Sequence, residues 1–559
     1  MIMSQSRYSG RGKHDIGPPF GHITRKATMA LISNDPERGF FGHPRGLAPL
    51  FFAEMWERFS FYGMRALLTL YLVKHFLYSD ETAGFIYASY ASLNYAMPVI
   101  GGLIADRYLG NRKAVMLGAI LLVCGHIGMA FEGSPAQIID GVIVRQSPYD
   151  QIMFLSLAFI IVGVGFLKSN ISTMVGKLYA DRDDPRRDPG YTIFYMGVNL
   201  GSFFSTIACG YLGETYGWAY GFGLAGIGMV LGLIVFAGGT KWYRNSEPPN
   251  PEQLKARTPI GLSREWLIYA GALAAVFINW QLVQWHAIVG TLLLVIVAVV
   301  LTGILWFSLT KCTKIERDRM IVVLVLTALS VVFWTLFEQA GTSLTLFADR
   351  NSDRSLFGII VPASVVQVFN PMFIVLLAPV FSWGWVRLAQ KGLEPSTPLK
   401  FALAILQVGL GFGALVFGAS LAGEDAQTGL FWLGLGYLLH TTGELCLSPV
   451  GLSMISRLSV ARITAMVMGV WFLASAGAHF LAGWVASLAS TSTEPGQVMT
   501  PQESLPVYTS VFWDLFIWAT IIAVLVALIS PFLKKLMHTD AADMHASPKE
   551  VLKTTEKRI

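Results

Sequence analysis

The sequence predicts an all-α polytopic membrane protein. Of the 559 residues, 54% are hydrophobic and only 14% are charged, whereas a soluble globular domain is about one quarter charged. The apolar residues gather in many runs of about 20, which is the length that a membrane-spanning helix needs. Short polar connections separate these runs, so the sequence excludes a large soluble domain.

Fourteen spans are expected, one for each apolar run. In chain order they cover residues 48–76, 82–106, 113–132, 151–176, 191–212, 218–240, 265–281, 285–310, 321–347, 358–388, 399–422, 428–454, 463–489 and 507–534. The seventh and eighth carry few charges, which is typical of a peripheral pair that lines no pathway. The predicted organisation is a tail at 1–45, six spans in 46–240, a linker with two extra spans in 241–320, six spans in 321–534, and a tail at 535–559.

The distribution of charge predicts the orientation of the spans. Lys and Arg collect in the connections after the even-numbered spans, near residues 107–113, 177–187, 241–264, 311–319, 387–400 and 457–462. The opposite connections, near 132–150, 348–357, 423–427 and 490–506, are mixed or acidic. Because cytoplasmic loops carry the excess of cations, both termini are expected in the cytosol. The net charge of +6 forms no sustained basic block with interleaved aromatics, so nucleic acid is not an expected partner.

The first span carries charges at membrane depth. Between Glu54 and Arg65 it holds two carboxylates, two guanidinium groups and a phenol. Such groups cost at least a few kcal/mol each in hydrocarbon, and they usually mark a transport pathway. Glu54, Glu57 and Arg58 are neighbours on one helical face, and Arg65 lies roughly 16 Å further along nearly the same face. We expect one end of this helix to exchange protons and the other to bind an anion.

Three further charged residues stand isolated inside apolar spans. They are Lys168 in the fourth span, Glu338 in the ninth and Glu444 in the twelfth. The buried cations, Arg65 and Lys168, belong to the first half of the chain, and the buried acids belong to the second half. Ion pairs between the halves that break on protonation would form a gate. The alternative is a set of permanent buried pairs that fixes helix register. Breaking such a pair by removing one partner typically costs about 3–5 kcal/mol, so an inactive mutant would not by itself separate the two interpretations.

Two sets of motifs resemble known families. The stretch Gly101-Gly102-Leu103-Ile104-Ala105-Asp106-Arg107, followed by Gly110-Asn111-Arg112-Lys113, resembles the loop between the second and third helices of the major facilitator superfamily. Its paired small residues let two helices approach closely. The segment Glu54-x-x-Glu57-Arg58-Phe59-Ser60-Phe61-Tyr62-Gly63 resembles the ExxERFxYYG signature of the proton-dependent oligopeptide transporter family. Residues 194–201, 334–341 and 443–452 resemble its fifth-, seventh- and tenth-helix motifs, and the resemblance covers about residues 41–534.

This resemblance implies two six-helix bundles around a central cavity, with the seventh and eighth spans inserted between them. It also implies a proton-coupled symporter that imports di- and tripeptides by alternating access. The same fold could instead carry another cargo, such as nitrate or a peptide-like anion. Protons are the expected coupling ion, with no other cofactor, no metal and no enzyme activity. A monomer in the plasma membrane (the bacterial inner membrane) is expected, with the lipid bilayer as its surroundings.

The family's functional residues map onto this sequence by motif. Glu54, Glu57 and Arg58 match the acid cluster linked to proton coupling, and Glu338 matches the acid paired with Arg65. The peptide carboxylate is expected to bind Tyr62, Arg65 and Lys168. Positions near the peptide amino terminus match Asn199, Asn370 and Glu444. The cavity lining is expected to include Tyr95, Trp334, Trp471 and Ser475.

The sequence departs from the family pattern at two places. Phe61-Tyr62 replaces the usual double tyrosine, which removes one phenol. Lys168-Ser169-Asn170 replaces Lys-Pro-Asn, which restores a backbone donor and favours a straighter helix. Altered affinity is expected from these changes, with activity retained.

Histidines receive a smaller role in this interpretation. Five fall in or near the spans: His75, His126, His286, His440 and His479. The second span, where animal relatives carry a histidine, contains none, so coupling is expected to depend on carboxylates. His440, one turn before Glu444, either tunes the proton affinity of that acid or packs as a neutral imidazole.

Overall fold

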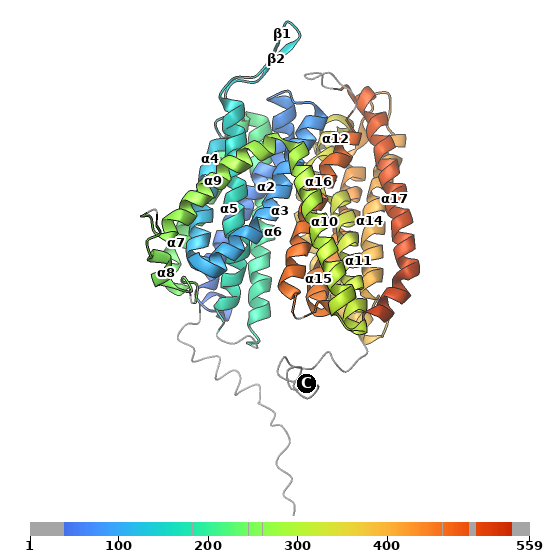
Figure 1. Cartoon of the computed structure of the whole chain (residues 1–559). Coiled ribbons are helices and arrows are strands. Elements are labelled where there is room, and N and C mark those ends of the chain that lie inside the picture. Colours follow the sequence, from blue (N-terminus) through green and yellow to red (C-terminus); the bar gives the residue numbers. More distant parts are fainter. Residues whose placement is uncertain are drawn as a thin grey trace, which may run out of the picture.

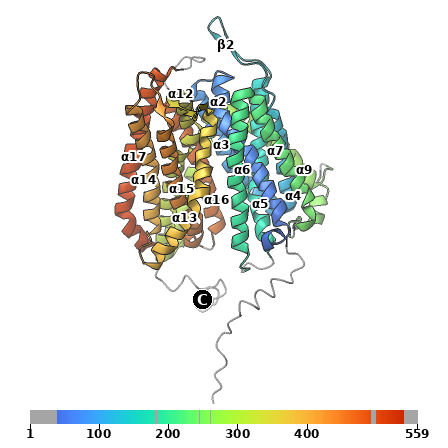
Figure 2. The same cartoon turned by 180° about the vertical axis from the view of Figure 1, so that it is seen from behind.

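The computed structural model describes residues 39–538, except 180–183, 244, 260, 461 and 491–498. Within these residues the chain is almost entirely helical, and long helices lie side by side in two groups (Figures 1 and 2). The predicted tails therefore fall largely outside the described residues. The predicted all-α membrane fold is confirmed.

The helices of the first group follow the predicted spans closely. They are α2 (Leu47–Lys74), α3 (Asp80–Ile104), α4 (Gly110–Met129), α5 (Tyr149–Lys177), α6 (Arg187–Tyr216) and α7 (Trp218–Gly238), with η1 (Phe40–Gly42) before α2, the π-helical η2 (Ala105–Leu109) before α4 and η3 (Thr240–Trp242) after α7. α5 runs without interruption through Lys168-Ser169-Asn170, as expected without the proline.

The linker contains a short helix and the inserted pair. It comprises α8 (Pro251–Lys255), α9 (Arg264–Gln284) and α10 (His286–Lys311). α9 packs against α5 and α3, and α10 packs against α16 and α3. The pair therefore lies at the periphery of the molecule and not between the two groups (Figure 1). Most of its side chains are exposed.

The second group begins after the linker. Its helices are α11 (Lys314–Phe337), η4 (Glu338–Gly341), α12 (Ser343–Asn351), η5 (Ala363–Val368), α13 (Phe369–Gln390), α14 (Thr397–Ser420), α15 (Leu430–Leu458), α16 (Thr464–Leu488) and α17 (Pro501–Leu536). By length and composition alone, 11 helical segments of the described chain could cross a membrane, one of which joins α3 and α4. The count of fourteen spans stays a prediction.

The predicted span at 321–347 lies within one segment, Lys314–Asn351, that is long and apolar enough to cross a membrane, but its helix is not regular throughout. The helix breaks at η4, and Thr342 leaves helical geometry with φ −130° and ψ −96°. A Cβ at Gly341 would lie 2.1 Å from the Tyr87 hydroxyl, so only glycine permits this approach of α3. The Gly341 carbonyl accepts a hydrogen bond of 2.6 Å from the Thr69 hydroxyl, which satisfies a backbone group that the break leaves free.

Short strands occur only in the connections among the described residues. β1 (Gln137–Ile139) and β2 (Val142–Val144) form an antiparallel hairpin that projects from one end of the molecule (Figure 1). Its turn, Asp140 and Gly141, has positive φ at both residues, as a two-residue hairpin turn requires. The other pairs are β3 (Ser352–Asp353) with β6 (Thr428–Gly429), and β4 (Ser355–Leu356) with β5 (Ile359–Ile360).

Small residues allow the closest helix contacts, both within and between the groups. Within the first group, a Cβ at Gly101 would lie 2.0 Å from the Gly165 carbonyl oxygen, so the paired glycines of the loop motif do allow close approach. Between the groups, α3 packs against α16. There a Cβ at Gly483 would lie 2.2 Å from the Cβ of Ala88.

Candidate functional site

The acid cluster of α2 is brought together as the helical spacing predicts. The Arg58 guanidinium lies 3.4 Å from Glu54 Oε1 and donates to both oxygens of Glu57, at 2.8 Å to Oε1. All three residues are buried. Among the described residues Glu54 Oε2 has no hydrogen-bond partner. Arg58 thus holds two carboxylates, and within the described residues one of them keeps an oxygen without a hydrogen-bond partner.

Arg65 and Glu338 form an ion pair between the two helix groups. Arg65 Nη2 contacts Glu338 Oε2, and both side chains are about nine-tenths buried or more. Arg65 Nε also donates to the Tyr87 hydroxyl at 2.6 Å. Glu338 is the first residue of η4, so the pair ties α2 to the helix break. His479 Nδ1 lies 3.5 Å from the same Glu338 oxygen, a contact that the sequence analysis did not anticipate.

Lys168 and Glu444 have separate surroundings. The Lys168 ammonium lies 4.0 Å from the centre of the Tyr95 ring. Glu444 Oε2 accepts a hydrogen bond of 3.0 Å from Asn370 Nδ2, which also donates to Thr441. The ion pairs of the described residues do not include Lys168 with Glu444, and that gating pair stays a prediction.

A cavity of about 430 Å³ lies beside the acid cluster, within the size range of small-molecule sites. Its lining comes from α2, α3, α5 and α6: Glu54, Arg58, Tyr62, Tyr95, Lys168, Ser172, Tyr191, Phe194, Tyr195 and Val198. Five of these residues are in the predicted site. Ser172 and the four residues of α6 were not predicted, although the motif at 194–201 was a signal that α6 faces the site.

The remaining predicted site residues are not among those that line this cavity. Asn199 donates to the Tyr195 carbonyl at 3.2 Å, and Ser475 donates to the Trp471 carbonyl, also at 3.2 Å. Trp334 packs edge-on against Phe333 and Phe337, with ring centres 5.2 and 5.3 Å away. None of the predicted residues of the second group is among the lining residues. Glu338 contacts Arg65 of the first group, whereas Trp334, Asn370, Glu444 and Ser475 contact neighbours within their own group.

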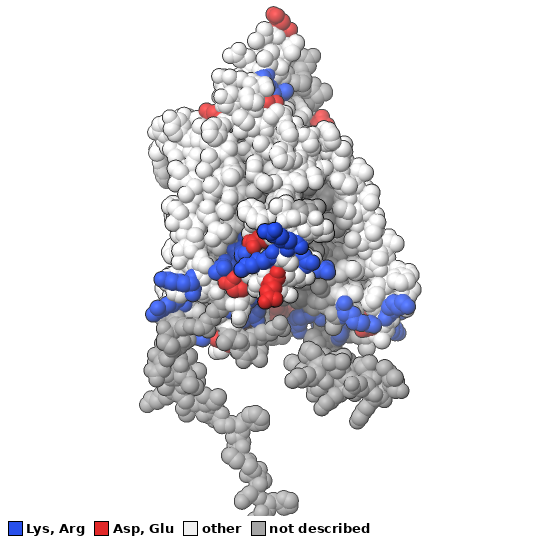
Figure 3. Space-filling view, turned by 60° about the vertical axis from the view of Figure 1, so that its left-hand side comes forward, with Lys and Arg blue, Asp and Glu red and all other residues white. Residues whose placement is uncertain are grey.

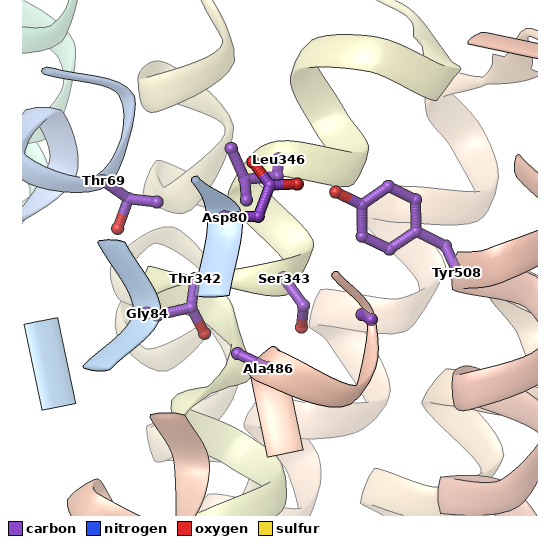
Figure 4. Close-up of a pocket in the computed structure, with 9 residues that line it drawn as sticks. Thr69, Asp80, Gly84, Thr342, Ser343, Leu346, Ala486 and Tyr508 are labelled. Carbon is purple, nitrogen blue, oxygen red and sulfur yellow. The ribbon is translucent and has the colours of Figure 1, made fainter. Parts of the chain in front are cut away.

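The groups are also joined near the end that carries the β1–β2 hairpin. Arg350 of α12 donates to both oxygens of Asp80 on α3, at 2.5 and 2.8 Å, and to the Tyr508 hydroxyl at 3.2 Å. A small cavity of about 10 Å³ lies beside them, lined also by Thr69 and Thr342. Figure 4 shows the Tyr508 hydroxyl pointing toward Asp80 across this cavity. The space suits no more than one water molecule, so the hairpin end of the molecule is closed here.

Charges gather at the opposite end. In Figure 3 most blue and red side chains lie in the lower part of the molecule, a few lie near the top, and the broad surface between them is white. Arg112 pairs with Glu247 at 2.8 Å, and Lys113 pairs with Glu265 at 2.5 Å. Two cations of the loop motif therefore bind acids of the linker. No group of three or more His, Cys, Asp or Glu suitable for a metal occurs in the described part of the chain.

Comparison with known proteins gives a consistent result. The family model described as "POT family" matches residues 112–502. The chain is 37% identical to the uncharacterized transporter YclF of Bacillus subtilis over 521 residues, which are 91% of this chain and 98% of that one. It is 36% identical to the peptide transporter YePEPT of Yersinia enterocolitica, over 82% of this chain and 90% of that one.

A solved structure agrees along nearly its whole length. It is the peptide transporter POT, as a point mutant in complex with alafosfalin, with a TM-score of 0.76 and 35% identity, covering 91% of this chain and 99% of that one. The fold, the acid cluster and the sequence matches agree, and this chain belongs to the POT family of membrane transporters.

Proposed function

We propose that this protein is a proton-coupled symporter that imports di- and tripeptides by alternating access. The observation that carries the proposal is the cavity of about 430 Å³, whose lining combines the cations Lys168 and Arg58 with the carboxylate of Glu54. A zwitterionic peptide needs a cation for its carboxylate, an acid for its amino group and aromatic walls for varied side chains. The tyrosines of α2, α3 and α6 provide such walls, which favours broad specificity.

The contacts between groups suggest which side is open. Asp80–Arg350 and Thr69–Gly341 join the groups near the hairpin. Glu214 of α6 also accepts hydrogen bonds from the backbone of Ala363 and Ser364. Lysines and arginines mark the opposite end as cytosolic, so we assign this conformation as closed to the outside. Both termini would then lie in the cytosol, and the membrane would be the bacterial inner membrane.

Protonation would act on the buried acids of this pathway. Glu54 has an unpaired oxygen beside the cavity, and Glu338 holds Arg65. A proton on Glu338 would remove the charge that binds Arg65 and shift the population toward the other conformation. A proton on Glu54 would weaken its attraction to Arg58 and change the charge that the substrate meets.

Uptake of labelled dialanine into proteoliposomes tests the proposal, with and without an inward proton gradient. Wild type should accumulate dialanine only with the gradient. Glu54→Gln should lose this accumulation but keep counterflow, which requires no net proton movement. Folded wild-type protein that moves nitrate but no dipeptide in either mode would overturn the peptide assignment.

A further inference from the structure

His479 of α16 contacts the carboxylate that links the two helix groups. Its Nδ1 atom lies 3.5 Å from Glu338 Oε2, the same oxygen that Arg65 Nη2 contacts. The imidazole side chain is only 6% exposed. Nδ1 is buried and has no hydrogen-bond partner among the described residues. The imidazole nitrogen and the guanidinium therefore approach the same carboxylate oxygen, and within the described part of the chain Nδ1 makes no hydrogen bond.

The ring of His479 also packs against Tyr95, which lines the cavity. The two ring centres are 4.4 Å apart, and the Lys168 ammonium lies 4.0 Å from the Tyr95 ring. Tyr95 and Lys168 both line the cavity. His479 follows the predicted lining residue Ser475 by four positions, so the two side chains lie on one face of α16.

The groups that face His479 come from several elements. They are Glu338 of η4, Arg65 of α2, Lys168 of α5 and the Tyr95 phenol of α3. The acid attracts a protonated ring, and the two cations repel it. The charge of His479 therefore depends on whether Glu338 is ionised and on where Arg65 and Lys168 lie.

We propose that His479 is a second proton-accepting site of the coupling apparatus, and that it competes with Arg65 for Glu338. This inference rests on the proposed symport function. A proton bound at Nδ1 makes an imidazolium that attracts Glu338 Oε2 and weakens its hold on Arg65. Transfer of that proton to Oε2 leaves a neutral imidazole and a neutral carboxylic acid, so Arg65 is released to bind a peptide carboxylate. Histidine suits this role because it is the side chain that ordinarily titrates near neutral pH.

Transport assays separate this role from simple packing. His479→Asn keeps a polar side chain of similar position but cannot carry a proton, and His479→Gln is a second variant in case the first folds poorly. His126→Asn is the matched control, because His126 is also buried, in α4, and forms no ion pair within the described residues. We expect the His479 variants to keep dialanine counterflow and to lose roughly tenfold in gradient-driven accumulation, within the 5–150-fold range of coupling between sites. The His126 variant should match wild type in both modes.

Two results would overturn the proposal. One is a folded His479→Asn protein whose accumulation and dependence on external pH equal those of wild type. The other comes from NMR of ring-labelled histidine in nanodiscs, with the His479 signal assigned by its loss in the variant. That signal should titrate with pH and shift its midpoint in Glu338→Gln. A signal that does not titrate in either protein would refute the role, even if wild type transported no dipeptide at all.

Discussion

Arg350 and Asp80, which are 270 positions apart in the chain, form a buried two-pronged ion pair between α12 and α3. The two side chains are 5% and 9% exposed. The pair lies next to Tyr508 and the small cavity of Figure 4. It therefore joins the two helix groups near the end of the molecule that carries the β1–β2 hairpin.

Asp80→Asn should destabilise this closed state. The substitution leaves the buried Arg350 guanidinium without its charge partner, which typically costs about 3–5 kcal/mol. Thermal unfolding in detergent measures the loss, and labelling of a cysteine placed on the hairpin side reports opening. Lys74→Gln is the control, because the Lys74 side chain is 38% exposed in its pair with Asp349 and such a pair contributes less than about 1 kcal/mol. Equal effects of both substitutions would contradict the assigned closure.

Lys168→Met should weaken binding of the peptide carboxylate. Removal of a charged hydrogen-bond donor costs about 1.5–3 kcal/mol, which predicts a rise of roughly 10–150-fold in KM for dialanine. The amide of dialanine has no carboxylate, so its uptake should be unaffected. Lys241→Met removes another cation over an aromatic ring, that of Trp242 at 4.6 Å, but outside the cavity, and should leave KM unchanged. A similar loss for dialanine and its amide would argue against the carboxylate role.

Gly483→Ala should disturb the contact of α3 with α16. The new methyl group would lie 2.2 Å from the Cβ of Ala88, and overpacking of this kind typically costs about 1–3 kcal/mol. Thermal unfolding should show this loss of stability. Uptake should also be slower, because the contact between α3 and α16 must re-form in each transport cycle. Gly477→Ala on the same helix meets no atom within 4 Å and should behave as wild type.

Phe61→Tyr should change affinity without abolishing transport. The Phe61 ring lies under Arg58, with the guanidinium carbon 5.1 Å from the ring centre. Tyrosine offers the same π face, so this contact is retained while a phenol is added near Tyr62. Uptake kinetics of dialanine measure the result, and a complete loss of gradient-driven uptake in folded protein would show that the phenylalanine is required.

Much of the fold and part of the candidate site follow from the sequence alone. The apolar runs determine where helices occur, because hydrocarbon tolerates no unpaired backbone group. Helical spacing determines that Glu54, Glu57 and Arg58 meet, because neighbours at three and four positions share a face. The motifs determine the family, and loop cations indicate the orientation.

The contacts between distant helices were decided only by the tertiary structure. Two buried cations and two buried acids were expected to pair between the groups. Among these four residues, Arg65 pairs with Glu338. Lys168 instead lies over the Tyr95 ring, and Glu444 accepts a hydrogen bond from Asn370. Three further features were not predicted from the sequence: the approach of His479 to Glu338, the Asp80–Arg350 pair and the helix break at Gly341. Each depends on the rotation and depth of one helix against another. Packing along the full length of both helices sets these quantities, and no local pattern of residues encodes them.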